Sequence, residues 1–397
     1  MFGAMSRHAV AVLIVAIASP LAGQGHQHES TPAVPAAERA AASASAKETA
    51  GGSMMSGAKR RFTPAEKLLQ ADMRLDLIRR NGTEREIYDR YLAKLGAQPM
   101  LDVLEERNPY CHGEAHELGR ALYLLRRDVG VAISECSMGC TGGCLHGVLK
   151  EAYGDRKVEE ITAKLDDICD GLTMAKPGSC AHGMGHALMM MSGRDVARSV
   201  AACGGFGKPV LDYYCQTGLF MELFDRQEEW KEQRAADRFY PCSTAGGYPS
   251  ACWRYLGPSL LVSASNDRGK VLGLCRSLPR AQRLGCLYGY GWANLPLVAT
   301  RPDFLATICP SEPIDDATVC IEGLVEYLWS FDPAAAKRSC NSLQGRPAEI
   351  CREAAHEGFY RLEKPSLPLY LTPGAGDSAK EPASPSASAQ PSSDGTR

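Results

Sequence analysis

The spacing of the cysteines constrains the fold of this chain more than any other feature of its sequence. Most of them fall into two interleaved series, each of which advances by 31 to 39 residues per step. The first series is Cys144, Cys180, Cys215, Cys252, Cys286, Cys320 and Cys351. The second series is Cys136, Cys169, Cys203, Cys242, Cys275, Cys309 and Cys340. Two series with one common period predict a repeated structural unit that carries one disulfide per repeat.

The predicted disulfides join a second-series cysteine to the first-series cysteine that follows it. In six pairs the partners are 10 to 12 residues apart. These pairs are Cys169 with Cys180, Cys203 with Cys215, Cys242 with Cys252, Cys275 with Cys286, Cys309 with Cys320, and Cys340 with Cys351. By analogy Cys136 pairs with Cys144, which leaves Cys111 for Cys140, although four cysteines allow three connectivities.

The segments around the cysteines carry the start signals of helices. Thr63, Pro64 and Glu66 supply an N-cap, a first-turn proline and a capping-box glutamate, and Thr83 with Glu86 repeats the capping box. No run of alternating β-branched residues predicts a strand. A period near 34 residues is typical of two-helix solenoid repeats. We therefore expect an all-α fold, a right-handed α/α solenoid of about seven or eight disulfide-stapled two-helix repeats.

The repeat also resembles a known family. Segments such as "CDGLTMAKPGSC" and "CPSEPIDDATVC" are similar to the joints of secreted cysteine-rich, tetratricopeptide-like helical repeat proteins of the Sel type. The resemblance covers about Cys111 to Tyr360, and it implies helix pairs bridged by disulfides. This chain has Cys-x-x-Gly where that family has Ala-x-x-Cys-x-x-Leu-Gly, so the resemblance concerns the architecture.

The chain divides into five predicted segments. An n-region with Arg7 followed by an apolar run from Ala9 to Ala18 is typical of a signal peptide, with an uncleaved anchor as the alternative. The predicted segments are a signal peptide at 1–23, a disordered Ala/Ser/Pro/Gly-rich linker at 24–60, capping N-terminal helices at 61–110, cysteine-stapled repeats at 111–363, and a disordered Pro/Ser-rich tail at 364–397. Sixteen cysteines indicate an oxidising compartment, so we expect a periplasmic or secreted protein without a membrane span after signal cleavage. A net charge of −2 argues against a nucleic-acid partner.

The histidines of the repeats stand at aligned helix positions. His112 and His116, like His182 and His186, are four residues apart and therefore share one helix face, and His146 occupies the aligned position in the repeat between them. The last repeats carry carboxylates at these positions, and Glu353 with His356 forms a Glu-x-x-His pair of the kind that helical di-metal proteins use. The predicted ligands are His112, His116, His146, His182, His186, His356, Glu322, Glu326 and Glu353.

Two functions of different classes fit these patterns. In the first, the repeats bind a transition metal ion (Cu, Zn or Fe) through histidines clustered on a concave face, and the protein is a metal-binding protein or a metalloenzyme. In the alternative, the protein is a non-enzymatic extracytoplasmic scaffold whose groove binds a protein, peptide, small molecule or envelope partner, with Arg254, Tyr288 and Trp292 as anchors. The sequence assigns no catalytic residue. Convergence of the imidazoles would favour the metal.

Overall fold

The structure, a computed structural model, describes residues 62–108, 110–173, 175–225 and 231–360. The chain divides into two units, Met1–Ser56 and Gly57–Arg397, and the described residues belong to the second. They form α-helices and short 3-10 helices, and none of them lies in a strand, which confirms the all-α prediction. The predicted signal peptide (1–23), linker (24–60) and tail (364–397) fall outside the described residues.

Within the described residues, three helices precede the first cysteine. Both capping boxes are confirmed, since the Thr63 and Thr83 side chains each accept a backbone N–H and the Glu66 and Glu86 carboxylates accept the backbone N–H of these threonines. The three helices are α2 (Pro64–Arg79), α3 (Glu84–Leu95) and α4 (Ala97–Arg107).

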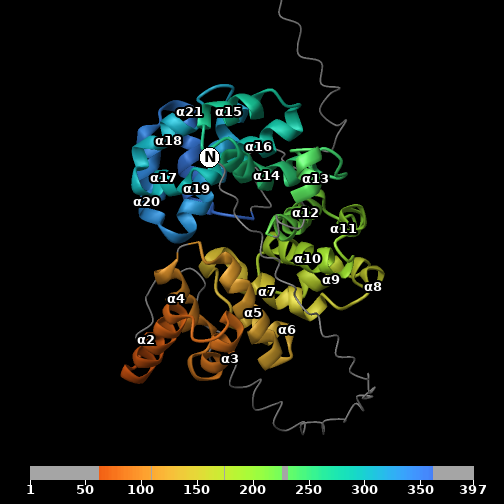
Figure 1. Cartoon of the computed structure of the whole chain (residues 1–397), viewed down its shortest axis with the longest axis vertical. Helices are drawn as coiled ribbons and strands as arrows, with labels where there is room; N and C mark the ends of the chain where they lie inside the picture. Colours follow the sequence, from red (N-terminus) through yellow and green to blue (C-terminus); the bar gives the residue numbers. More distant parts are fainter. Residues whose placement is uncertain (1–61, 109, 174, 226–230, 361–397) are drawn as a thin grey trace, which may run out of the picture. The chain divides into compact units, whose positions relative to one another are not determined.

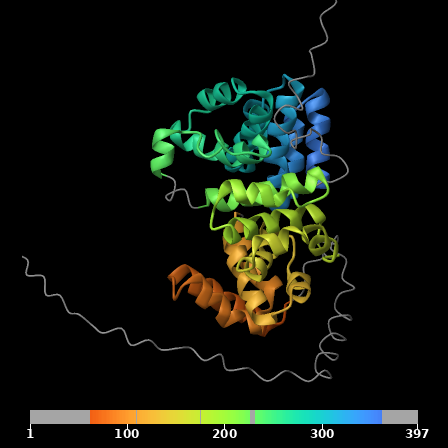
Figure 2. The ribbon, with the colours of Figure 1, turned by 90° about the vertical axis from the view of Figure 1, so that its right-hand side faces the viewer.

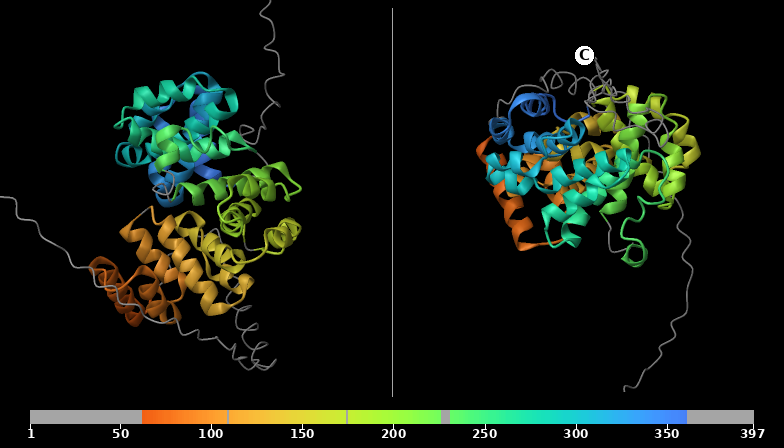
Figure 3. Two further views of the ribbon diagram at one scale, coloured as in Figure 1. Left: turned by 45° about the vertical axis from the view of Figure 1, so that its right-hand side comes forward. Right: turned by 90° about the horizontal axis from the view of Figure 1, so that it is seen from above.

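Eight longer helices, here called the long-helix row, pack in chain order, each against the next. In Figure 1, α10 packs beside α12, and α16 packs against α19 further along the chain. Figure 2 and Figure 3 show the same ribbon from other sides. The row consists of α5 (His112–Arg126), α7 (Gly143–Tyr153), α10 (Pro177–Met191), α12 (Pro209–Phe224), α14 (Pro249–Ser263), α16 (Arg280–Ala293), α19 (Ile314–Phe331) and α21 (Gly345–Glu357). This packing in sequence order is that of a helical solenoid; its right-handed sense stays a prediction.

Shorter helices connect the members of the row. Asp195 caps the helix after it through the backbone N–H of Arg198, and Asp332 caps the first helix of the last connection in the same way through Ala335. The connecting helices are α6 (Val129–Glu135), η1 (Gly139–Gly142), α8 (Val158–Thr162), α9 (Leu165–Asp170), α11 (Val196–Cys203), α13 (Lys231–Ala236), α15 (Arg268–Arg276), α17 (Leu295–Thr300), η3 (Pro302–Phe304), α18 (Leu305–Ile308), α20 (Pro333–Ser339) and η4 (Cys340–Ser342). None of the helices in the described ranges combines the length and the apolar character that crossing a bilayer requires.

All sixteen cysteines form disulfides, and the pairs are the eight that the spacing suggests. They join Cys169 to Cys180, Cys203 to Cys215, Cys242 to Cys252, Cys275 to Cys286, Cys309 to Cys320, Cys340 to Cys351, Cys136 to Cys144 and Cys111 to Cys140. Seven of these bridges tie the segment before a helix of the row to that helix. Each closed loop stabilises the fold by about 2–4 kcal/mol in the chain-entropy model.

Glycines allow the helices of the row to approach closely. A Cβ atom at Gly147 on α7 would lie 2.0 Å from the carbonyl oxygen of His116 on α5, and one at Gly218 on α12 would lie 1.8 Å from that of His182 on α10. Any side chain at these positions would push the helices apart. The close approach brings the aligned histidines of neighbouring repeats into contact range.

Candidate metal centre

Five histidines from three neighbouring helices converge in the structure. His112 and His116 lie one turn apart on α5, and His182 and His186 lie one turn apart on α10. His146 lies on α7, which packs against both α5 and α10. The repeat therefore brings together the five histidines that the sequence places at aligned positions.

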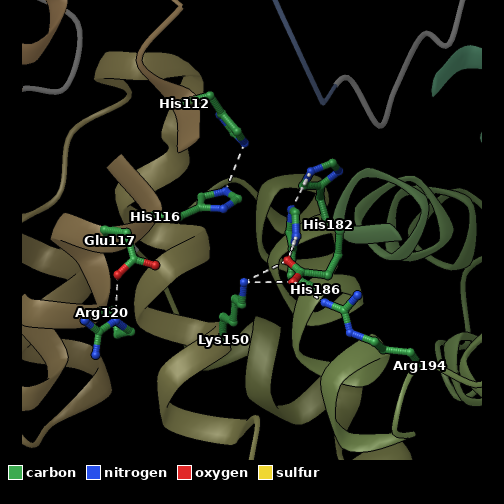
Figure 4. A network of polar contacts seen from close by, with 9 residues as sticks. His112, His116, Glu117, Arg120, Lys150, His182, His186 and Arg194 are labelled. Atoms are coloured by element: carbon green, nitrogen blue, oxygen red, sulfur yellow. Dashed lines mark hydrogen bonds and ion pairs between the residues drawn. The ribbon is translucent and has the colours of Figure 1, made fainter. Parts of the chain in front are cut away.

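The ring nitrogens are close enough to share one ion. One nitrogen from each of His112, His146, His182 and His186 lies within 4.8 Å of the others. Nε2 of His182 and Nε2 of His186 are 3.2 Å apart (Figure 4). Two nitrogens that bind one tetrahedral zinc-like ion lie about 3.3 Å apart. The contact therefore has the spacing of two ligands on one metal.

Burial favours the neutral form of four of these imidazoles. Burial, with a smaller contribution from His186, lowers the pKa of His112 to about 4. Burial also lowers the pKa of His116, His146 and His182 well below its usual value, and the neighbouring imidazoles add to this effect. Neutral imidazole is the form that binds a metal ion.

Hydrogen bonds at Nδ1 set the tautomers of the α10 histidines. Nδ1 of His182 lies 2.8 Å from the hydroxyl oxygen of Thr217, whose own hydrogen goes to the carbonyl of Tyr214, so this Nδ1 is the donor. Nδ1 of His186 lies 3.1 Å from a carboxylate oxygen of Glu222 and donates to it. Nε2 of His182 then carries a lone pair, which points to Nε2 of His186 at 3.2 Å. A metal ion between the two rings would bind this lone pair.

The other two helices offer lone pairs to the same centre. Nδ1 of His112 donates to the Cys140 carbonyl at 3.0 Å, so its Nε2, which lies 3.0 Å from Nε2 of His116, is an acceptor. His146 is fully buried; its Nε2 lies 3.2 Å from the Ser179 hydroxyl, and its Nδ1 has no hydrogen-bond partner. An unsatisfied buried polar atom costs about 1–3 kcal/mol. A metal ion would satisfy this nitrogen.

A buried carboxylate supports the cluster from behind. Glu222 on α12 accepts from His186 and, at 2.9 Å, from Lys150, and Arg194 lies 3.7 Å away (Figure 4). Burial by itself raises the pKa of Glu222, but the hydrogen bond from His186 and the charge of Lys150 outweigh it and lower the pKa to about 2. A carboxylate behind a ligating histidine fixes its tautomer and strengthens it as a ligand. Glu222 is not among the predicted site residues, although a single carboxylate in the apolar run "GLFMELF" was a signal for it.

The predicted ligands from the last repeats do not join this group. Glu322 and Glu326 are buried on α19, where Glu326 accepts from the Tyr288 hydroxyl at 2.9 Å. Glu353 and His356 are exposed on α21. The convergent group that the described residues contain consists of histidines from the first repeats alone.

Two of the three anchors that the scaffold hypothesis predicts are buried. Arg254 is 6% exposed and Tyr288 is 3% exposed, because α12, α14 and α16 enclose them. Trp292 is half-buried. The side chains of Arg254 and Tyr288 therefore lie inside the protein, and their role as anchors of a partner in a groove stays a prediction.

The end of the described chain returns to the cluster. The ring of Tyr360 lies 5.6 Å from that of His182 and 6.2 Å from that of His146. Lys176, at the start of α10, donates to the Phe359 carbonyl at 3.2 Å. Tyr360 is not among the predicted site residues, because a contact between residues 178 positions apart has no local signal in the sequence. Tyr360 covers one side of the histidines with an aromatic ring.

Comparison with known proteins adds no assignment to this geometry. No family model, curated protein or solved structure matches the chain. The resemblance to Sel-type repeat proteins therefore extends to a helical, disulfide-rich architecture, and the function has to be inferred from the site itself.

Proposed function

We propose that the protein is an extracytoplasmic metal-binding protein that holds one transition metal ion between α5, α7 and α10. The ligands are Nε2 of His112, Nδ1 of His146, Nε2 of His182 and Nε2 of His186, with His116 beside them as a fifth imidazole. The observation that carries this proposal is the convergence of four ring nitrogens within 4.8 Å, three of them on buried histidines. The hydrogen bonds at Nδ1 of three of these histidines support it, because they leave each Nε2 lone pair free for an ion.

The donor set favours copper or zinc. Every cysteine is in a disulfide, so no thiolate is present, and the carboxylate of Glu222 lies behind a histidine. Imidazole suits Zn, Cu, Fe and Ni, and among divalent ions the affinity of a nitrogen site peaks at Cu²⁺. We therefore expect Cu²⁺ to bind most tightly, with Zn²⁺ next.

The surroundings favour retention of the metal over open catalysis. Four protein ligands fill a tetrahedral shell, whereas a catalytic zinc site keeps one position for water or substrate. His146 and His186 have no exposed surface, and Tyr360 covers the cluster on one side. Eight disulfides fit an oxidising compartment outside the cytoplasm, where such a protein would hold its metal.

Metal content tests the proposal directly. The disulfide-bonded protein is purified from an oxidising compartment, and bound transition metals are counted per chain by mass spectrometry before and after reconstitution with Cu²⁺ or Zn²⁺. The variant is His182→Ala with His186→Ala, and the matched control is His356→Ala, which removes an exposed histidine from α21. We expect one ion per chain in the wild type and the control, and loss of the ion in a double variant that remains helical. Absence of metal from the reconstituted wild type would refute the proposal.

A further inference from the structure

A second polar cluster lies in the later repeats, around Arg254. This residue occupies on α14 the repeat position that His146 and His182 occupy on α7 and α10. Its side chain is buried, and within the described ranges it makes no ion pair with a carboxylate. An arginine stays protonated in proteins, and a buried charge without a partner strongly destabilises the fold. Among the described residues, Arg254 therefore lacks a carboxylate in direct contact with its guanidinium.

The neighbours of Arg254 are neutral tyrosines. Its guanidinium carbon lies 4.0 Å from the ring centroid of Tyr288 and 5.4 Å from that of Tyr255, and Nη1 lies 3.4 Å from the hydroxyl of Tyr213. Burial raises the pKa of all three phenols, so none of them supplies a negative charge near neutral pH. The carboxylate of Glu326 accepts a hydrogen bond from the hydroxyl of Tyr288.

A second donor in the same cluster also lacks an acceptor. Tyr255 is 4% exposed, and its hydroxyl oxygen has no hydrogen-bond partner in the described structure. A carboxylate is an acceptor with two oxygens, which match the fork of a guanidinium and accept a further hydroxyl. One small anion would therefore satisfy both Arg254 and Tyr255.

The cluster adjoins the candidate metal centre through one turn of α12. Tyr213 faces Arg254, while the carbonyl of Tyr214 accepts from Thr217, whose hydroxyl accepts from His182. The rings of Tyr214 and Tyr360 are 5.3 Å apart, and Tyr360 in turn contacts His182. A ligand held by Arg254 would thus lie next to the residues that line the metal.

We propose that Arg254, Tyr213 and Tyr255 form a binding site for a small carboxylate-bearing ligand beside the histidine cluster. Arg254 binds the carboxylate through its two-pronged guanidinium, and the two phenol hydroxyls donate to the same anion. Tyr288 holds the guanidinium plane by stacking against it. The anion balances the charge of Arg254 without a metal ion. The proposed anion site can therefore be tested independently of the metal centre.

Ligand-dependent unfolding of the full-length, disulfide-bonded protein tests the site. The unfolding midpoint is measured in sodium chloride, sodium acetate and sodium phosphate at pH 7 and equal ionic strength, with the protein both metal-free and metal-loaded. The variants are Arg254→Met and Tyr255→Phe, and Arg346→Met on the exposed face of α21 is the control. We expect saturating acetate to raise the wild-type midpoint by about 3 °C or more relative to chloride.

Each variant has its own expected result. Arg254→Met should match or exceed the wild-type midpoint in chloride, because it removes an unpaired buried charge, and it should not respond to acetate. Tyr255→Phe, which keeps the fold even if the arginine variant does not, should need about tenfold more acetate for the same shift. Arg346→Met should respond as the wild type does.

Three results would overturn the site. They are an equal acetate response in wild type and Arg254→Met, the absence of any response beyond that to chloride, and a response to phosphate alone. The first two would show that no anion binds at Arg254. The third would show that the ligand is not a carboxylate.

Discussion

Glu222 connects the histidine cluster to a neighbouring positive charge through hydrogen bonds. Its carboxylate accepts from His186 on one side and from Lys150 on the other. A neutral amide at this position would still reach His186 but would bind it less strongly, because hydrogen bonds to an ionised acceptor are about twice as strong. The carboxylate therefore acts on the metal through the basicity of His186.

Replacing Glu222 by glutamine should weaken metal binding by about 10- to 100-fold. The dissociation constant for Zn²⁺ is measured by competition with a chelator, on protein whose helical content is unchanged. Glu353→Gln, a change of the same kind at an exposed position of α21, serves as the control and should leave the constant unchanged. Equal affinity in Glu222→Gln and wild type would contradict a role for this carboxylate behind a ligand.

The buried histidines also predict how the metal-free protein responds to pH. The folded-state pKa of His112 is about 4, against 6.5 for an unperturbed histidine, and those of His116, His146 and His182 are lowered too. Between these values the unfolded chain binds protons that the folded chain does not, so the free energy of unfolding falls as the pH falls below 6.5. The slope is at most about 1.4 kcal/mol per pH unit for each such histidine.

Urea unfolding of the metal-free protein at pH 7 and pH 5 measures this response. We expect lower stability at pH 5, and a smaller difference in His112→Gln, which removes one of the contributing groups. His356→Ala, which changes an exposed histidine, should keep the wild-type difference. The same free energy of unfolding at both pH values would mean that the cluster is accessible to protons when folded.

At the scale of the elements, glycines decide how closely the helices of the row approach. Gly218 lets α12 contact the backbone of α10 at His182, and Gly147 lets α7 contact α5 at His116. The residues that precede these glycines, Thr217 and His146, belong to the site. Helix packing and the position of the ligands therefore depend on the same contacts.

Gly218→Ala should destabilise the protein by about 1–3 kcal/mol, because the added Cβ would lie 1.8 Å from a carbonyl oxygen that belongs to backbone. Gly273→Ala provides the matched control, since this exposed glycine of α15 has open space around its Cβ position. The control should stabilise the protein by about 0.5–1 kcal/mol. Thermal unfolding of both variants measures these effects, and similar midpoints in the two would argue against the close approach.

The sequence predicts those parts of the fold and site that follow from the repeat. The cysteine period predicts the stacked helices, and aligned positions on stacked helices are neighbours, so His112, His146 and His182 could be grouped before any coordinates. Glu326 and Glu353 show where alignment stops being informative. Aligned residues several repeats apart share a face of the array without sharing a site, and their separation depends on curvature that the sequence does not encode locally.

Two further residues of the site were beyond the reach of the repeat pattern. Glu222 lies one helix away from the histidines at an unaligned position, and only the fold places it behind His186. Tyr360 comes from the end of the described chain and packs against a helix from the early repeats. Arg254 stands at an aligned position of the repeat, which the sequence shows. That its side chain is buried could be seen only in the structure.

At the scale of the whole molecule, the last described residues pack against the site that the early repeats form. Gly178 on α10 provides the space for Tyr360, since a Cβ there would lie 3.0 Å from the Tyr360 Cβ. Helix α19 also contacts η1, the segment that carries Cys140 and the carbonyl to which His112 donates. Late and early repeats therefore both contribute to the surroundings of the histidines.

Tyr360→Ala should speed release of the metal, because the ring no longer covers the histidines. The rate rises about tenfold for every ~1.4 kcal/mol by which the activation free energy of release falls. The rate of Zn²⁺ transfer to an excess of chelator measures this effect. Phe304→Ala removes an aromatic ring of similar size that stacks on Arg301, away from the cluster, and should leave the rate unchanged. Equal rates in all three proteins would show that Tyr360 does not limit access to the histidines.

X-ray absorption spectroscopy of the zinc-loaded protein tests the central claim most directly, because it reports the number and kind of atoms around the ion. We predict four nitrogen ligands at about 2.0 Å, with the multiple-scattering pattern of imidazole and without sulfur. His182→Ala should lower the imidazole count by one, and His356→Ala should leave it at four. A shell with two or fewer imidazoles, or one dominated by oxygen, would contradict a metal centre built from His112, His146, His182 and His186.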